Sequence, residues 1–234
     1  MNEMGAKILE YGCLIAAIVL SLSIHEFSHA WMATKLGDPT PRATGRISLN
    51  PIRHIDIFGF IVMIFAHFGW AKPVQVNPMY FRNPSKGMMY TALAGPISNI
   101  GLCLLFSPLY YLSSYFFLMN PAVEWIRYLQ LFMGYMVMLN ITLAVFNMIP
   151  IYPLDGSRVV GHYFPRYATF MARYADIVQL VFICLLILPD FVRGVPDIIG
   201  FLIGTVQGYV VSWLMMFWNL ILGLFPIGWI QVLF

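Results

Sequence analysis

The stretch HEFSHAWMA, residues 25–33, places two histidines and a glutamate inside an apolar run that covers residues 8–36. A run of this length can cross a hydrocarbon core of about 30 Å as a helix. An ionised side chain near the centre of such a helix costs about 2.5–3.5 kcal/mol. Some partner must therefore compensate for His25, Glu26 and His29.

The spacing of these residues suits a metal ion. Residues four apart share one face of a helix, so His25 and His29 can present two imidazoles to one cation, with Glu26 beside it. This is the HExxH arrangement, in which neutral imidazoles bind zinc at about 2.0–2.1 Å. The alternative is a pair of histidines that line a path for protons or ions.

The composition of the whole chain indicates an α-helical polytopic membrane protein. Of its 234 residues 60% are hydrophobic and 10% are charged, against about 25% charged in a typical soluble domain. Four apolar runs are long enough to cross a bilayer, and they cover residues 8–36, 88–117, 125–148 and 198–224. A fifth run, residues 167–188, is weaker because Arg173 and Asp176 interrupt it. We expect five to six transmembrane helices.

The domain organisation and the partners follow from the same pattern. The chain has no internal repeat or linker, so we expect a single domain over residues 1–234, with a catalytic core over about 8–160 and C-terminal helices over about 167–234. The net charge of +3 comes from basic residues spread along loops, which argues against a nucleic-acid partner. The expected environment is a lipid bilayer, and the oligomeric state stays open.

The loop between the first two apolar runs is basic and patterned. Residues 35–86 hold seven Lys or Arg against two acids, which predicts a cytoplasmic location. With five crossings the N-terminus is then outside and the C-terminus inside. Residues 44–49 and 72–76 alternate in polarity and predict a short β-hairpin. Residues 57–70 are apolar but too short to span the bilayer, which suggests a re-entrant loop.

A catalytic zinc needs three protein ligands and one open position. The extended soluble pattern HExxHxxGxxH is absent, because positions 32 and 35 hold Met and Lys in place of its Gly and its third ligand His. Asp38 and Asp56 lie in the basic loop, and Glu124 belongs to the opposite membrane face. Asp155 remains, at the cytoplasmic end of the third long run and at the depth of the histidines.

These residues together resemble a known family. HEFSHA in the first run, with Asn147, Pro150 and the sequence Pro153-Leu154-Asp155-Gly156 in a later one, resembles the site-2 protease family of intramembrane zinc metalloproteases. The stretches GWAKPVQVNP, residues 69–78, and LAGPISN, residues 93–99, look like the small bacterial branch of that family, without appended domains. The resemblance covers residues 25–158.

The resemblance implies that His25, His29 and Asp155 bind one zinc ion and that Glu26 is the general base. It implies a zinc metalloendopeptidase of the bacterial inner membrane, with its active site near the cytoplasmic face. Its substrates would be other membrane proteins, cut within or near their transmembrane segments.

Three further residues are predicted to contact the substrate: Asn147, Pro153 and Ile47. Asn147 lies eight residues before Asp155, about two helical turns away and on a similar face. Ile47 belongs to the predicted hairpin, whose edge could pair with an extended substrate. The alternative function is a metal-ion or proton transporter that uses His25, His29 and Asp155 as a transit site.

Overall fold

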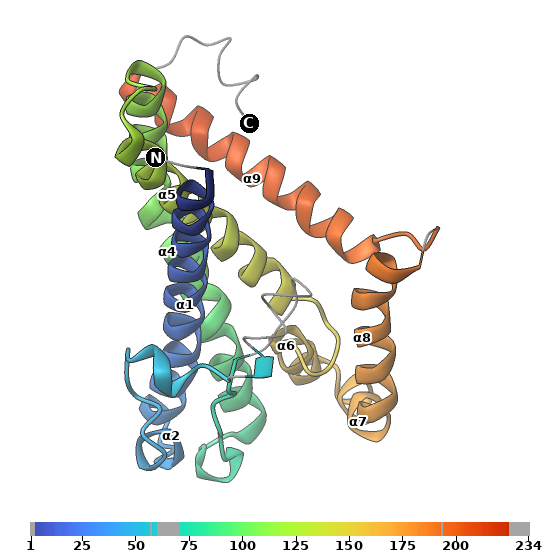
Figure 1. Ribbon diagram of the computed structural model, residues 1–234. Helices are drawn as coiled ribbons and strands as arrows, with labels where there is room; N and C mark the ends of the chain where they lie inside the picture. Colours follow the sequence, from blue (N-terminus) through green and yellow to red (C-terminus); the bar gives the residue numbers. More distant parts are fainter. Residues whose placement is uncertain (1–2, 57, 60–70, 193, 225–234) are drawn as a thin grey trace. The chain divides into compact units, whose positions relative to one another are not determined.

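The computed structural model describes residues 3–56, 58–59, 71–192 and 194–224. Four of its helices are long and apolar enough to cross a membrane (Figure 1). They are α1 (Glu3–Lys35), α4 (Pro84–Met119), α5 (Glu124–Asn147) and α9 (Ile198–Leu222). These helices match the four long apolar runs of the sequence. The protein is therefore an α-helical, multi-pass membrane protein.

Shorter helices fill most of the remaining described chain. They are α2 (Thr40–Ala43), the 3-10 turns η1 (Pro51–Arg53) and η2 (Pro78–Tyr80), α6 (Asp155–Tyr163), α7 (Pro165–Arg173) and α8 (Ala175–Phe191). The weaker fifth run, residues 167–188, is broken into α7 and α8, which are bent by 82°. The described helices thus give four candidate crossings, or five if this bent pair forms one span.

The predicted β-hairpin is not found. Residues 44–49 form a turn, a bend and irregular chain, and residues 72–76 are irregular and belong to no strand. One isolated antiparallel bridge joins Ile55 to Ala71. Alternating polarity alone does not make a strand, because ladder pairing also needs a partner in register. The predicted re-entrant loop lies largely outside the described residues, which include only 58 and 59 of residues 57–70.

The end of α1 shows why the first helix stops where it does. Gly37 has φ of +107°, which a glycine adopts without steric cost. The amide of Asp38 donates to the carbonyl of Ala33 at 3.0 Å, and the amide of Gly37 donates to the carbonyl of Thr34 at 3.1 Å. This pair of bonds is the Schellman motif, which satisfies carbonyls left free at a helix end.

The chain divides into two compact units. The first contains Met1–Ser21, Asn99–Leu143 and Gly204–Phe234, and the second contains Leu22–Ser98 and Ala144–Ile203. A single domain over the whole chain stays a prediction.

Buried amide side chains hold the first unit together. Asn140 accepts a hydrogen bond from the Asn99 amide at 2.7 Å and donates one to the Ser21 hydroxyl at 2.8 Å. All three residues are fully buried. Hydrogen bonds between membrane helices of this kind contribute about 0.6 kcal/mol on average. They join α1, α4 and α5 within this unit.

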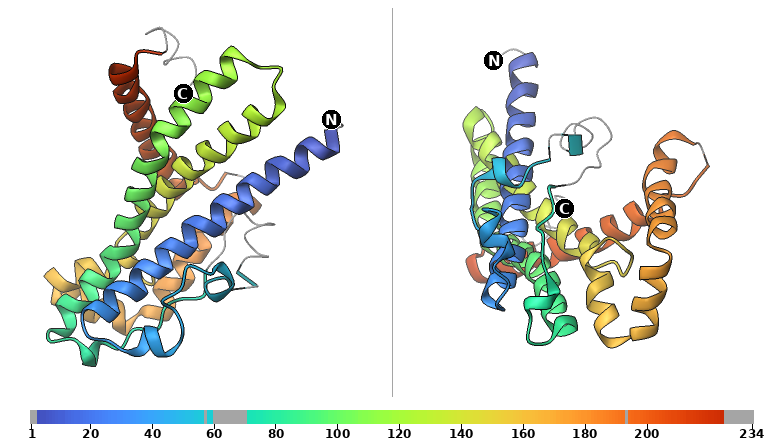
Figure 2. Two further views of the ribbon diagram at one scale, coloured as in Figure 1. Left: turned by 90° about the vertical axis from the view of Figure 1, so that its left-hand side faces the viewer. Right: turned by 90° about the horizontal axis from the view of Figure 1, so that it is seen from below.

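In the second unit, the C-terminal part of α1 and the N-terminal part of α4 lie side by side, with the basic loop leading from one to the other (Figures 1 and 2). The helices α6 and α7 pack against each other, and a Cβ added at Gly161 would lie 3.3 Å from the Cβ of Ala168. The second unit contains all the residues predicted for the site.

A candidate metal centre on α1 and α6

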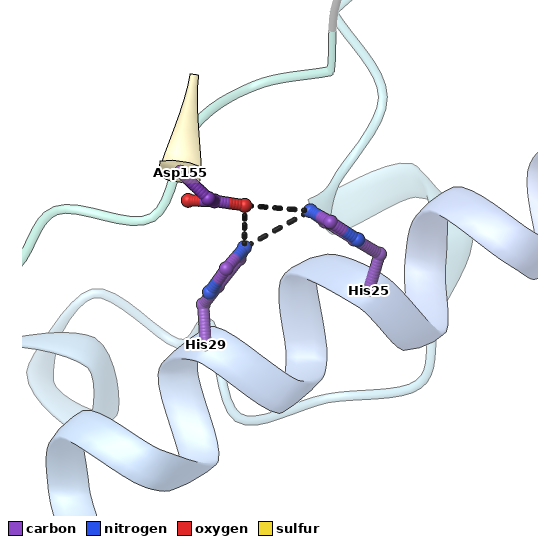
Figure 3. Close-up of side chains that lie close together, drawn as sticks. All are labelled: His25, His29 and Asp155. Carbon is purple, nitrogen blue, oxygen red and sulfur yellow. Dashed lines mark hydrogen bonds and ion pairs between the residues drawn. The ribbon is translucent and has the colours of Figure 1, made fainter. Parts of the chain in front are cut away.

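Three side chains meet at one point of the second unit. The Nε2 atoms of His25 and His29 are 3.0 Å apart, and they lie 3.4 and 3.2 Å from Oδ2 of Asp155 (Figure 3). These are the three predicted zinc ligands, from segments separated by more than a hundred residues. The structure brings their potential ligand atoms together.

The donor set fits a zinc ion. Two imidazoles and a carboxylate are a combination that catalytic zinc takes, at about 2.0–2.2 Å from each ligand atom. Ligand atoms at the corners of such a tetrahedron are about 3.3 Å apart, and the three observed distances are 3.0, 3.2 and 3.4 Å. The three residues could therefore hold zinc with small side-chain adjustments.

The histidines are presented by α1 and oriented by α4. Their rings are 4.6 Å apart between centroids and almost perpendicular, at 84°. Nδ1 of His29 lies 2.7 Å from the carbonyl oxygen of Thr91. A carbonyl can only accept, so Nδ1 carries the proton and Nε2 keeps its lone pair for a metal.

A glycine of α4 makes room for both rings. A Cβ at Gly95 would overlap with ring atoms of His25 and of His29. Gly95 therefore allows the backbone of α4 to approach the metal centre closely. It belongs to the LAGPISN stretch, but the sequence alone did not reveal this packing role.

Asp155 enters the site differently from its predicted position. It is the first residue of α6, whereas α5 already ends at Asn147, so Asp155 does not lie at the end of the third long helix. The prolines at 150 and 153 fall in the intervening turn. A Cβ at Gly156 would overlap with the backbone of Met148. The turn thus folds closely against the start of α6, where Asp155 lies.

The Asp155 carboxyl is held in its charged form. Burial raises its pKa, but when His25 and His29 are protonated their hydrogen bonds and positive charges outweigh burial and bring the pKa below its ordinary value. An anionic oxygen is the form that binds a metal ion.

Glu26 lies beside the cluster and outside it. It is half-buried, and Oε2 accepts a hydrogen bond from the backbone amide of Val74 at 3.3 Å. The carboxylate is therefore held by the segment of residues 72–77 and is not one of the three clustered candidate ligands.

That segment is itself anchored at both ends. The amide of Lys72 donates to the carbonyl of His54 at 2.8 Å, and buried Arg46 donates to the carbonyl of Lys72 at 3.3 Å. At the other end, the amide of Asn77 donates to fully buried Asp38 at 2.7 Å. Arg46 and Asp38 were missed as contributors, because only their tertiary contacts reveal their role.

The predicted substrate residues are placed near the turn and in the loop. Asn147 is the half-buried last residue of α5, Pro153 is exposed and Ile47 is half-buried. The predicted helical relation of Asn147 to Asp155 is wrong, because the turn interrupts the helix between them. No hydrogen bond or ion pair of the described residues links Ile47 or Pro153 to the cluster. Their contact with substrate stays a prediction.

The remaining histidines have other roles or lie elsewhere. Buried His54 contacts the carbonyl of Ser48 through Nε2 at 2.6 Å. His162 contacts the Ser85 hydroxyl at 2.8 Å. His67 lies outside the described residues.

Comparison with known proteins places the chain in a family. Residues 119–189, which include Asp155, match the model of peptidase family M50. A Bacillus subtilis protein described as "Putative zinc metalloprotease YwhC" is 37% identical over 65% of this chain and 69% of its own length.

A mycobacterial relative extends the match. "Putative zinc metalloprotease Rip2" of Mycolicibacterium smegmatis is 30% identical over 85% of this chain and 76% of its own length. No solved structure gives a significant match. The chain therefore belongs to peptidase family M50, the site-2 protease family of zinc metalloproteases.

Proposed function

We propose that the protein is an intramembrane endopeptidase that hydrolyses peptide bonds within or near the transmembrane segments of other membrane proteins. His25, His29 and Asp155 hold one zinc ion, and Glu26 is the general base. The observation that carries this proposal is the cluster itself, with ligand atoms 3.0–3.4 Å apart and two of its three members on a candidate membrane span.

The position of the cluster along α1 supports cleavage at membrane depth. His25 precedes the last residue of the helix, Lys35, by ten residues, which is about 15 Å at 1.5 Å per residue. The hydrocarbon core is about 30 Å thick. The histidines thus lie well inside the span and near one end of it.

The chemistry divides between the metal and the protein. Bound zinc would supply a Lewis acid that polarises the substrate carbonyl and brings the pKa of a water molecule to about 7. Glu26 would accept a proton from the water whose oxygen bonds to the carbonyl carbon, and would pass that proton to the amide nitrogen as the C–N bond breaks. The Val74 amide keeps the Glu26 carboxylate in place for both transfers.

The substrate must be extended where it is cut, because the amides of a helix are occupied by their own hydrogen bonds. We assign the binding of its backbone to Asn147, Pro153 and Ile47, around the turn and the basic loop. The segment of residues 72–76 supports this assignment, since it belongs to no strand and its backbone could pair with an extended peptide.

The location follows from charge. The basic loop of residues 35–86 leads directly from the histidine-bearing end of α1, and an excess of Lys and Arg favours the cytoplasmic side. The related proteins come from bacteria. We therefore assign the protein to the bacterial inner membrane, with its active site near the cytoplasmic face.

The test is the variant Glu26→Gln in reconstituted vesicles with a transmembrane substrate. Loss of a general base costs about 10²–10⁴-fold in rate, so cleavage should fall by at least about 100-fold while the zinc content stays at the wild-type level. Glu124→Gln, which changes an exposed acid at the start of α5, should cleave normally.

Two results would decide against the proposal. A cleavage rate of Glu26→Gln equal to that of the wild type would show that Glu26 is not the general base. Zinc-loaded wild-type protein that moves metal ions across the vesicle membrane without cleaving any substrate would favour the transporter.

A further inference from the structure

A basic pocket lies where the end of α1 meets the start of α4. It has a volume of about 430 Å³ and is lined mainly by Leu36, Phe81, Arg82, Lys86 and Tyr90. This volume falls within the range of about 300–1,000 Å³ typical of small-ligand sites. All of the lining residues belong to the second unit.

The floor of the pocket is apolar and tightly built. Phe81 is only 5% exposed, and its ring packs directly against Gly87. A Cβ at residue 87 would overlap with this ring, so the packing requires glycine there. Leu36 is half-buried at the same place. The floor therefore suits the apolar part of an amphipathic ligand.

The rim of the pocket is positive. Arg82 and Lys86 are exposed, and no acidic side chain lines the pocket. In the part of the chain that the structure describes, neither residue takes part in an ion pair. The first turn of α4 adds the positive end of a helix dipole. The rim is thus complementary to an anion.

Aromatic residues indicate that the pocket lies at the membrane surface. Trp31 is exposed with Nζ of Lys35 4.6 Å from its ring centroid. Tyr90 is exposed with Nζ of Lys86 5.7 Å from its ring centroid. Trp and Tyr gather at the level of lipid headgroups, and lysines there extend toward water.

An apolar path leads from the pocket along α4. Exposed Ile97 lies seven residues after Tyr90, which puts both side chains on one face of the helix. Acyl chains could follow this face while the headgroup stays in the pocket. A free phosphate would make no use of either the path or the apolar floor.

We propose that this pocket binds the phosphate of an anionic phospholipid, with Arg82 and Lys86 on the phosphate oxygens and the acyl chains against Tyr90 and Ile97. Basic pockets between membrane helices on the cytoplasmic side are suited to such headgroups. The site is separate from the metal centre, and its occupancy does not depend on whether the protein cleaves peptides.

The experiment measures lipid binding to the full-length, delipidated protein in neutral detergent. The probes are dioleoyl phosphatidylglycerol, dioleoyl phosphatidylcholine and inorganic phosphate. Phosphatidylglycerol should bind saturably, and phosphatidylcholine should not. Each cation near a membrane surface contributes about fivefold in affinity, so Arg82→Gln with Lys86→Gln should weaken binding about 10- to 30-fold.

Three further variants make the result specific. Arg42→Gln with Arg166→Gln removes the same charge from exposed residues outside the pocket and should bind phosphatidylglycerol as the wild type does. Lys86→Glu should bind more weakly than Lys86→Gln, and an unchanged thermal unfolding midpoint for each variant shows that it is folded.

Three outcomes would overturn the proposal. Equal losses in the two double variants would mean that binding follows net charge alone. Equal binding of both lipids would show that the pocket does not recognise the negative charge of the headgroup. Saturation by inorganic phosphate at the same concentration as the lipid would assign the pocket to a small anion.

Discussion

The two histidines and the glutamate of the HEFSHA stretch each meet a partner from a distant part of the chain. His25 and His29 meet Asp155, His29 also donates to the carbonyl of Thr91, and Glu26 accepts from the amide of Val74. Polar groups at membrane depth are tolerated when protein groups or ions satisfy them. These contacts therefore offset the free-energy cost of placing polar side chains on α1, a helix long and apolar enough to cross a membrane.

Gly95 gives a prediction at the residue scale. In Gly95→Ala the added Cβ would displace both imidazole rings. Zinc affinity should therefore fall by about 10- to 100-fold, the loss typical when groups that orient metal ligands are removed. Zinc titration with a competing chelator measures this. Gly101→Ala on the same helix is the control, since a Cβ there has no neighbour within 4 Å. Equal zinc affinities in the two variants would contradict the packing role of Gly95.

The elements themselves were predictable to different degrees. Four apolar runs became α1, α4, α5 and α9, because long apolar segments have few alternatives to helix in a membrane. The stop after Lys35 followed from Gly37. The only sign in the sequence of the break at Tyr174 between α7 and α8 was the pair Arg173 and Asp176, which interrupts the apolar run of residues 167–188. The hairpin failed because alternation predicts extended chain and says nothing about its partner.

The segment of residues 72–77 provides a prediction at the element scale. Val74→Pro removes the amide that donates to Glu26, and it should lower the cleavage rate about 10-fold, because a misplaced base transfers protons poorly. Zinc content should not change. Val74→Ala keeps the amide and is the control for the lost side chain. A Val74→Pro rate equal to that of Val74→Ala would show that this hydrogen bond does not position the base.

At the scale of the whole molecule, the sequence predicted which residues form the candidate site but not how they are supported. The two histidines and Asp155 could be selected by residue type, spacing and depth. Gly95, Arg46 and Asp38 could not, because their roles depend on contacts between segments far apart in sequence, such as Asp38 with the amide of Asn77, 39 residues away. Single-sequence patterns carry little information on such contacts.

The number of crossings can be measured directly. Alkaline phosphatase fused after Asn120 should be active outside the cell, a fusion after Phe164 should be inactive, and one after Val195 should be active, because Lys and Arg favour the cytoplasmic loops. An inactive fusion after Val195 would show that the α7–α8 pair does not cross the membrane. An active fusion after Phe164 would contradict the predicted cytoplasmic location of the site.

The joint binding of one zinc ion by α1 and α6 is tested most directly by the metal content of Asp155→Ala. Wild-type protein should bind about one zinc ion per chain, the number that a single site with three protein ligands holds. Asp155→Ala should lose it, and Asp176→Ala, which alters an exposed acid in the first turn of α8, should retain it. Wild-type zinc content and affinity in Asp155→Ala would contradict a centre shared between the two helices.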